Sequence, residues 1–544
     1  MAGSAVWKEA VQMSLYLNPG SEGFEEVLRT EYVDKTGLIG LTNRTIGTKQ
    51  KLVCVSRPRR FGKSFAAQML SAYYDRSCDS HALFDGLMVS QLPDYEMRIN
   101  QFNVIYLDIT GFISEIKKNK GSLLNVPAKI NHAVKEELLA VCPELSPEKE
   151  LTECLVEYVK RDGRKFYFII DEWDAMIREA RNDQDAQEAY LNLLREWFKN
   201  GNFTPFAVAG AYMTGILPIK KDGTQSAISD FEEYNMLQPG PYGKYIGFTE
   251  EEVAGLCEEK HADFSRMRQW YDGYRVRNVG SVYNPNSVMK AIRYDAFDSY
   301  WTETSAAEGL LEYICKDYSG LSRTIAELVG GIDVPVDTVG FANDLTTFRG
   351  KDDVLTLLIH LGYLSYDSEN KKARIPNEEI RREFSKSIRT TEHAATQKRL
   401  LESSRLFDST IRLDEEAVAT QIEKVHMEET SPLHYNDEQS LRSVLKLAYY
   451  TYRDHYLQWE ELPAGVGYAD IVYFPKNNSG WPALVVELKW NRSAESAIDQ
   501  IRRKQYPEAI REYTGEILLV GINYDKNAKA GNRRHTCRIE RLQK

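Results

Sequence analysis

Cysteine and histidine are scarce in this chain of 544 residues, and neither type is grouped. The seven cysteines include no C-x-x-C pair and the nine histidines are dispersed, which disfavours a disulfide scaffold and a structural zinc site. No apolar run approaches the roughly eighteen residues of a membrane-spanning helix, and the opening residues lack a basic segment followed by an apolar core. We therefore expect reduced thiols, no secretory signal, no membrane contact and a cytoplasmic location.

Net positive charge is also missing. Lys and Arg total 69 against 80 for Asp and Glu, which gives a formal net charge of −11. This balance disfavours a protein that coats nucleic acid through bulk charge. It leaves room for a local basic groove, because charges are screened over about 8 Å at physiological salt.

Linkers rich in glycine, serine or proline do not occur, and neither do internal repeats or low-complexity tracts. At about 150 residues per domain the length predicts three to four domains, and 42% apolar residues suffices for several cores. The domain boundaries must therefore be inferred from the secondary structure and the motifs that each segment predicts.

Short apolar runs alternate with helical patterns in the first part of the chain. These runs lie at 51–56, 102–109, 165–171 and 205–213. Continuous apolar strands separated by helices indicate an α/β fold with a parallel sheet covered on both faces. From about 249 to 430 the pattern turns mostly helical, and segment 355–367 predicts a helix that runs into a small hairpin.

The last part of the chain predicts a compact αβ module. After residue 431 a helical stretch leads into two strands at 467–474 and 481–490, joined by polar turn residues at 475–480. A further strand at 516–524 follows another helix.

A candidate phosphate-binding loop, SRPRRFGKS, follows the first apolar run and precedes a helical pattern. Gly62, Lys63 and Ser64 supply the parts of a Walker A motif. These are backbone N–H groups that face phosphates, a lysine for the outer phosphates and a hydroxyl for Mg²⁺. Arg57 replaces the first glycine of the motif, which leaves the nucleotide affinity open.

Other residues of this region extend the same hypothesis. Arg57, Arg59 and Arg60 are candidate ligands of nucleotide or DNA phosphates, although a solvated basic loop explains them equally well. Asp171 and Glu172 end the third run in the form of a Walker B motif, where Asp171 would hold Mg²⁺ and Glu172 would orient the hydrolytic water. Solvated acids at a strand end are the plain alternative. Thr214 is a candidate γ-phosphate sensor at the end of the fourth run.

The terminal hairpin carries a candidate metal site. Glu487 and Lys489 project from one face of their strand, with Leu488 on the other, and Asp470 lies on the neighbouring strand. Asp470 and Glu487 could share Mg²⁺, which favours carboxylate oxygens and activates water, while Lys489 would stabilise developing negative charge. The pattern D-x16-E-x-K is loose, because Glu-x-Lys also arises from cross-strand charge pairing on exposed strands.

Four segments together resemble a known family. RPRRFGKS, the upstream YVDKT, IIDEWD, and the pairing of WYDGYRV with VYNPNSV occur in the order of the bacterial AAA-ATPase-like family, which is commonly fused to a C-terminal PD-(D/E)XK nuclease. The resemblance implies a P-loop fold with the additional strand of AAA and related ATPases. It also implies that Glu438 supplements the metal site, that Gln500 orients water or a DNA phosphate, and that Tyr506 is structural. The aromatic residues of WYDGYRV are expected to pack in a core rather than to stack on bases.

Basic residues crowd the end of the chain. They are Arg502, Arg503, Lys504, Arg511, Lys526, Lys529, Arg533, Arg534, Arg538, Arg541 and Lys544. Such residues fit phosphate contacts that give affinity without base readout, and a solvated tail explains the last ones equally well.

We therefore expect three parts: an ASCE/AAA-like P-loop domain at 1–240, a helical domain with a winged-helix-like element at 241–430, and a restriction-endonuclease-like αβ domain at 431–544. The expected function is ATP-binding, nucleotide-regulated cleavage of DNA with Mg²⁺ or Mn²⁺, in defence or mobile-element biology, with a homo-oligomer as one assembly. Three alternatives stay open: a non-enzymatic nucleotide switch, an ATP-driven remodeller whose nuclease fold only binds nucleic acid, and a structural P-loop domain without turnover.

Overall fold

The structure is a computed structural model. It describes residues 14–219, 228–301, 318, 321–341, 348–390, 394–429, 445, 449, 456–463, 468–475, 481–503, 515–528 and 533–542. The chain forms two compact units, one of Met1–Ala306 with Pro335–Glu383 and one of Ala307–Val334 with Phe384–Lys544. The expected division into three parts at 241 and 431 stays a prediction. Within the described residues, no helix combines the length and the apolarity needed to cross a bilayer.

A five-stranded parallel sheet organises the first unit, in the order β2-β3-β4-β1-β5. Its strands are β1 (Leu52–Ser56), β2 (Asn103–Asp108), β3 (Phe166–Asp171), β4 (Val208–Gly215) and β5 (Glu232–Tyr234). The first four coincide with the four apolar runs, and β1, β3 and β4 are buried at every position. Strand β4 lies between β1 and β3, which is the additional-strand arrangement that the family resemblance implied.

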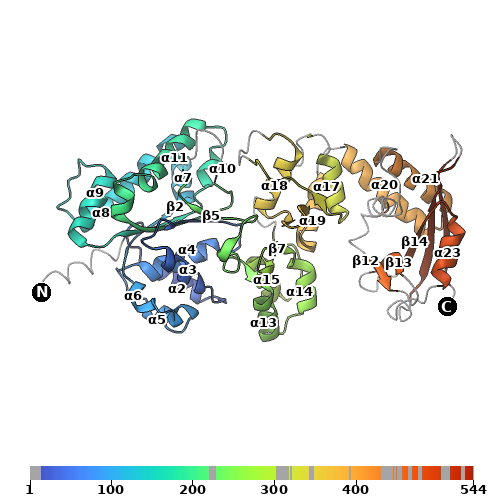
Figure 1. Ribbon diagram of the computed structural model, residues 1–544, viewed down its shortest axis with the longest axis horizontal. Helices are drawn as coiled ribbons and strands as arrows, with labels where there is room; N and C mark the ends of the chain where they lie inside the picture. Colours follow the sequence, from blue (N-terminus) through green and yellow to red (C-terminus); the bar gives the residue numbers. More distant parts are fainter. Residues whose placement is uncertain are drawn as a thin grey trace. The chain divides into compact units, whose positions relative to one another are not determined.

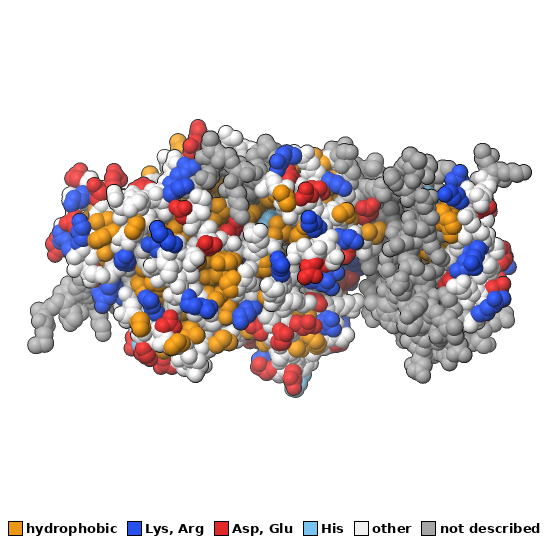
Figure 2. Space-filling view, in the orientation of Figure 1, with side chains coloured by type: hydrophobic (Ala, Val, Ile, Leu, Met, Phe, Trp, Pro, Cys, Tyr) orange, Lys and Arg blue, Asp and Glu red, His pale blue; other side chains and the backbone are white. Residues whose placement is uncertain are grey.

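Helices cover both faces of this sheet (Figure 1). One face carries α2 (Glu22–Leu28), α3 (Gly37–Thr45), α4 (Lys63–Tyr74), α5 (His81–Phe84) and α6 (Tyr95–Arg98). The other carries α7 (Ile109–Lys118), α8 (Val126–Val141), α9 (Leu151–Asp162), α10 (Ala175–Glu179), α11 (Gln184–Phe198) and α12 (Phe203–Ala207), which share one apolar core with the strands. Short 3₁₀ turns lie at η2 (Met88–Gln91), η3 (Leu123–Asn125) and η4 (Gly240–Tyr242). On the visible face, basic and acidic side chains are interspersed (Figure 2).

The rest of the first unit is mostly helical, as expected. It contains β6 (Phe248–Thr249), α13 (Glu250–Lys260), α14 (Phe264–Tyr271), β7 (Tyr274–Val276), β8 (Gly280–Tyr283), α15 (Pro285–Tyr294), α18 (Lys351–Leu361), β10 (Ser365–Asp367) and β11 (Lys372–Arg374). Strands β6, β8 and β7 form a small antiparallel sheet. Helix α18 runs into the hairpin β10–β11 where the sequence predicted a helix followed by a hairpin.

Sequence signals fix two of these helices. Thr249 and Glu252 form a capping box at the start of α13, and the Asn284 side chain caps α15, which has a proline at its first position. The aromatic segment WYDGYRV packs in the core, with Tyr271 and Tyr274 fully buried. Its Gly273 has φ +116°, and a Cβ there would lie 1.9 Å from the Pro376 carbonyl oxygen, so no other residue fits this close approach.

Helix α19 (Glu378–Thr390) begins in the first unit and ends in the second. In its first turn the buried carboxylate of Glu379 accepts hydrogen bonds from Ser287 Oγ of α15 at 2.9 Å and from the Tyr300 N–H at 2.8 Å. Burial raises the pKa of Glu379 to about 7, although these two donors favour the charged form.

The second unit is built on a five-stranded mixed sheet in the order β12-β13-β14-β15-β16. Its elements are α17 (Leu321–Val329), β9 (Val334–Pro335), where the chain returns to the first unit, α20 (Ala394–Ile411), α21 (Glu415–Glu429), β12 (Tyr456–Pro463), β13 (Tyr468–Pro475), β14 (Ala483–Trp490), α23 (Ala494–Arg503), β15 (Ile517–Tyr524) and β16 (His535–Arg541). Strands β12, β13 and β14 form an antiparallel meander, and α23 connects β14 to the parallel strand β15.

The two faces of this sheet have separate cores. Leu484, Val486 and Leu488 pack with residues of α20 and α21, whereas Ala483 and Val485 pack with residues of α23. Glu487 and Lys489 therefore lie on the α23 face, as the alternation along the strand predicted. The helix comes close to the sheet at Gly521, where a Cβ would lie 2.4 Å from the Ala494 carbonyl oxygen.

A buried chain of hydrogen bonds joins α21 to β16. His535 Nδ1 lies 2.5 Å from Glu423 Oε2, and because a carboxylate only accepts, this nitrogen carries the proton. His535 Nε2 lies 3.1 Å from His426 Nδ1. Burial, with smaller contributions from His535 and Arg534, lowers the pKa of His426 to about 4.

We expect His426 to make the protein less stable in mild acid. Between about pH 6.5 and pH 4 the unfolded state binds a proton that the folded state does not, so the free energy of unfolding falls as the pH falls. This linkage is worth on the order of 2 kcal/mol between pH 7.5 and pH 5. Denaturant unfolding at both pH values should show a flatter pH dependence for His426→Gln, and the exposed His132→Gln should behave as wild type. Equal pH dependence in all three proteins would contradict this role.

The described cysteines form no disulfide with one another. Cys315 lies outside the described residues.

Candidate nucleotide and metal sites

The candidate phosphate loop lies at the carboxyl edge of the parallel sheet, where ligands of such sheets bind. Residue Ser56, which ends β1, pairs with Gly215 at the end of β4. Between β1 and α4 the backbone turns through Arg60 and Gly62, whose φ angles are 66° and 88°. Gly62 occupies the N-cap of α4, and a Cβ there would meet no atom within 4 Å, so the space above the helix start is open. The unpaired N–H groups of that helix start suit an anion.

The loop lysine faces the predicted Walker B acids. Lys63 is 5% exposed, and its Nζ donates to the Pro58 carbonyl at 3.0 Å and lies 3.7 Å from Glu172 Oε1. Burial lowers the pKa of Lys63, and the charge of Glu172 opposes this shift. The structure therefore brings together the two segments that the sequence analysis paired.

Asp171 and Thr214 meet on adjacent strands. The buried Thr214 hydroxyl donates to Asp171 Oδ1, and the N–H of Glu172 also donates to that oxygen, at 3.1 Å. Among the described residues that line the adjacent pocket, neither Asp171 nor Thr214 occurs. Thr214 thus positions Asp171 here, and its role as a γ-phosphate sensor stays a prediction.

Glu172 is held between two cations. Its Oε1 faces Lys63, and its Oε2 accepts from Arg178 Nη2. Arg178 Nε donates to Asp174 Oδ2 at 3.0 Å, and the fully buried Asp174 accepts backbone N–H groups of Ile216 and Leu217 just after β4. These contacts tie α10 to the sheet edge.

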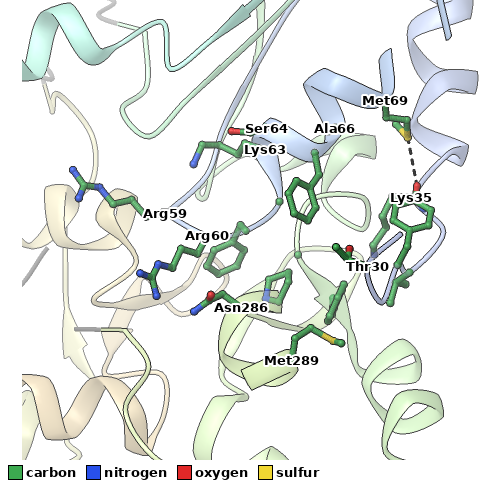
Figure 3. A pocket seen from close by; sticks show the side chains of 18 of the residues that line it. Thr30, Lys35, Arg59, Arg60, Lys63, Ser64, Ala66, Met69, Asn286 and Met289 are labelled. Carbon is green, nitrogen blue, oxygen red and sulfur yellow. Dashed lines mark hydrogen bonds between the residues drawn. The ribbon is translucent and has the colours of Figure 1, made fainter. Parts of the chain in front are cut away.

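A pocket of about 690 Å³ opens beside the loop. Lys63 and Ser64 lie on one side of it, Asn286 and Met289 on the opposite side, and Lys35 and Met69 on a third (Figure 3). Arg59, Arg60, Glu172 and Arg178 also belong to its polar lining. An apolar wall is formed by Tyr32, Phe65, Met69, Phe248 and Met289. Charged groups at one part and an apolar wall at another suit a ligand with phosphates and a flat base.

In the second unit three predicted residues converge. Glu487 is 1% exposed, and its Oε1 accepts from Lys489 Nζ at 3.1 Å and from Gln500 Nε2 of α23. Lys489 also donates to the Leu488 carbonyl at 2.9 Å. A buried carboxylate and ammonium on one face are costly unless they satisfy one another, and here they do so with the help of the half-buried Gln500 amide.

The other predicted metal ligands are described less fully. Asp470 lies on β13 beside Ile471, which pairs with Val486, the residue before Glu487, but its side chain lies outside the described residues. Glu438 and Tyr506 also lie outside them. Where side chains are described, no three His, Cys, Asp or Glu residues gather as a metal site.

The first unit's site has a counterpart among known families. Residues 20–225 match the family model of a predicted AAA-ATPase, AAA-ATPase-like. This match spans the phosphate loop, the Asp171–Glu172 strand end and β4. It confirms the AAA-ATPase-like part of the resemblance, while the fused nuclease stays a prediction. No curated protein matches the chain.

Solved structures with detectable likeness are remote. The Walker-type ATPase PABY2304 of Pyrococcus abyssi is 11% identical, with 64% of this chain and 94% of that chain covered and a TM-score of 0.30. The ORC2 protein of Aeropyrum pernix, in ADPNP–ADP complexes, is 13% identical, with 66% and 96% covered and a TM-score of 0.29. Cdc6p of Pyrobaculum aerophilum is 11% identical, with 65% and 93% covered and a TM-score of 0.23. At these TM-scores no property of those proteins is transferred to this chain.

Two arginines of the phosphate loop lie in different surroundings. Arg57 is buried and its Nη1 donates to the Ser56 carbonyl, whereas its Nε and Nη2 have no hydrogen-bond partner among the described residues. It is therefore a core residue and does not line the pocket. Burial lowers the pKa of Arg57 to about 10. Arg60 lines the pocket and donates to the Tyr300 carbonyl at 2.9 Å.

The basic tail is largely paired with acids. Arg533 binds Glu416 and Arg538 binds Glu415, both on α21, while Arg502 binds Glu540. These pairs fasten α21 and α23 to β16. The arginines are therefore less available for phosphates than the sequence suggested, while Lys504, Arg511, Lys529 and Lys544 lie outside the described residues.

Proposed function

We propose that the protein binds ATP in its AAA-ATPase-like domain and uses the nucleotide to regulate metal-dependent cleavage of DNA by its second unit. The observation that carries the nuclease half is the hydrogen-bonded cluster of the buried Glu487 and Lys489 with Gln500, beside the strand of Asp470. The same sheet runs as a meander followed by a helical crossover, which is the order that the PD-(D/E)XK resemblance implies.

The pocket beside the phosphate loop fits ATP. Lys63 and the N–H groups at the start of α4 would hold the phosphates, and the apolar wall would receive the base. Ser64 would bind Mg²⁺, and Asp171, which lies outside the pocket lining, would reach the ion through water. Glu172 would accept a proton from water, whose oxygen bonds to the γ-phosphorus as the bond from that phosphorus to ADP breaks. Burial raises the pKa of Glu172, although the charge of Lys63 opposes this shift. A raised pKa makes the carboxylate a better acceptor for that proton.

The second cluster fits phosphodiester hydrolysis. Mg²⁺ or Mn²⁺, when bound by Asp470 and Glu487, supplies Lewis acidity and a more acidic water. Lys489 would stabilise the negative charge that develops as the water oxygen bonds to phosphorus and the leaving ester oxygen departs. Gln500 would position Glu487, or water next to it, through the hydrogen bond that its side chain donates.

A switch without cleavage is the second candidate. Glu487 is already satisfied by Lys489 and Gln500, and such a pair is stable without metal. In that case the second unit would only bind nucleic acid, or a partner, under control of the nucleotide.

One assay tests both candidates. Full-length protein is incubated with single-stranded DNA, double-stranded DNA and RNA, with Mg²⁺ or Mn²⁺, and with or without ATP. Metal-dependent cleavage of DNA that changes with ATP supports the proposal. Nucleic-acid binding without cleavage under every condition overturns the nuclease and favours the switch.

A further inference from the structure

Four arginines line the nucleotide pocket: Arg59, Arg60, Arg178 and Arg293. One of them, Arg178, holds the proposed hydrolytic acid. Arg59 and Arg60 belong to the phosphate loop, whereas Arg178 belongs to α10 on the opposite side of Glu172. Arg178 Nη2 donates to Glu172 Oε2, and the side chains are 14% and 21% exposed. An ion pair this shielded is strong enough to set where the carboxylate points.

The same arginine is anchored from behind. Its Nε donates to Asp174 Oδ2 at 3.0 Å, and Asp174 is fixed by the N–H groups of Ile216 and Leu217. The anchor uses Nε, so the end of the guanidinium can exchange one oxygen partner for another while the stem stays in place. Arg178 therefore has the geometry of a fixed cation with one interchangeable contact.

Lys63 also contacts Glu172 from the other side of the carboxylate. Its Nζ is engaged by the Pro58 carbonyl and by Glu172 Oε1. Both cations that face the pocket at this point thus use Glu172 as their anion. An outer phosphate between them would offer oxygens that compete directly with that carboxylate.

We propose that Arg178 is a γ-phosphate-sensing residue that holds Glu172 in the nucleotide-free and ADP states and transfers its Nη2 contact to the γ-phosphate of ATP. This inference rests on the proposed ATP site and names how that site distinguishes ATP from ADP. Arg178 acts in the same chain as Glu172, so the exchange needs no second subunit. Releasing the Glu172 carboxylate lets it turn towards water only when a γ-phosphate is present.

The test compares two nucleotides on the full-length protein. Dissociation constants for the non-hydrolysable ATP analogue AMP-PNP and for ADP, each with Mg²⁺, are measured by calorimetry. Arg178→Ala should weaken AMP-PNP about tenfold or more and change ADP by less than about twofold, because only the analogue carries the γ-phosphate. Arg178→Lys keeps the charge but loses the fork, and should fall between the two proteins.

A matched variant on the same helix distinguishes γ-phosphate sensing by Arg178 from a purely structural role in holding α10. Glu179 lies on α10 and forms an exposed ion pair with Lys117 of α7. Glu179→Gln removes this pair and should leave both dissociation constants unchanged. Equal weakening of AMP-PNP and ADP in Arg178→Ala, or no weakening of either, would show that Arg178 only fastens α10 and would overturn this inference alone. Failure of the wild-type protein to bind either nucleotide would overturn the proposed ATP site as well.

Discussion

Replacing Lys489 with alanine is expected to lower the rate of metal-dependent DNA cleavage by about 10²-fold or more, without changing ATP binding. Removing a single preorganised group that stabilises developing charge typically costs 10²–10³-fold in rate. Lys489 is 7% exposed and donates to Glu487 Oε1, so its ammonium group is held beside the proposed metal ligand. Glu487→Gln should have a comparable effect, because it removes a carboxylate proposed to bind the metal. Plasmid nicking with Mg²⁺ or Mn²⁺ measures both variants.

Two controls make this result specific. Glu495→Gln removes an exposed carboxylate from α23, the helix that carries Gln500, and should cleave at the wild-type rate. Because burying an unpaired Glu487 or Lys489 can destabilise the unit, circular dichroism must show that each variant is folded. Cleavage at the wild-type rate by folded Lys489→Ala and Glu487→Gln would refute the assignment of this cluster.

The second large effect is expected at the phosphate loop. Lys63→Ala should weaken ATP binding by about 10²-fold or more, because it removes the buried cation that faces the outer phosphates. Glu172→Gln should retain ATP binding and lose about 10²–10⁴-fold in turnover, since an amide cannot accept the proton of water. Calorimetry measures binding, and release of inorganic phosphate measures turnover.

An exposed lysine provides the reference for this experiment. Lys118→Ala on α7 removes a positive charge from the same unit without touching the pocket, and should bind ATP as the wild type does. Loss of affinity in Lys118→Ala as large as in Lys63→Ala would point to general electrostatics rather than to a phosphate site. Unchanged turnover in Glu172→Gln would remove Glu172 from the proposed reaction.

Apolar strands could be predicted from the sequence, whereas three polar edge strands of the large sheets could not. The apolar runs became β1–β4, because a strand covered on both faces must be apolar throughout. In the two five-stranded sheets, the strands that were not predicted are β5, β12 and β16, and each lies at the edge of its sheet. Edge strands carry polar and charged residues that discourage aggregation, as in YLQWEELP of β12 and HTCRIER of β16, so their sequences do not differ from those of loops.

The candidate sites divide along a similar line. Gly62, Lys63 and Ser64 are contiguous, and Glu487 and Lys489 share one strand, so local spacing was enough to find them. The apolar wall of the pocket joins Tyr32, Phe65 and Met289, which are brought together only by folding. One feature of the sequence could have indicated Arg178. It lies four residues after Asp174, and this spacing places both side chains on one side of a helical turn.

The continuity of α19 has a practical consequence for dividing the protein. The boundary between the units falls between Glu383 and Phe384, inside a helix that runs from Glu378 to Thr390. A fragment that starts at Phe384 would lose the first turn, with the Glu379 carboxylate that Ser287 and the Tyr300 N–H hold in the intact chain. A protease that cleaves at this point, or an expression fragment that begins there, would leave a frayed helix end on both products.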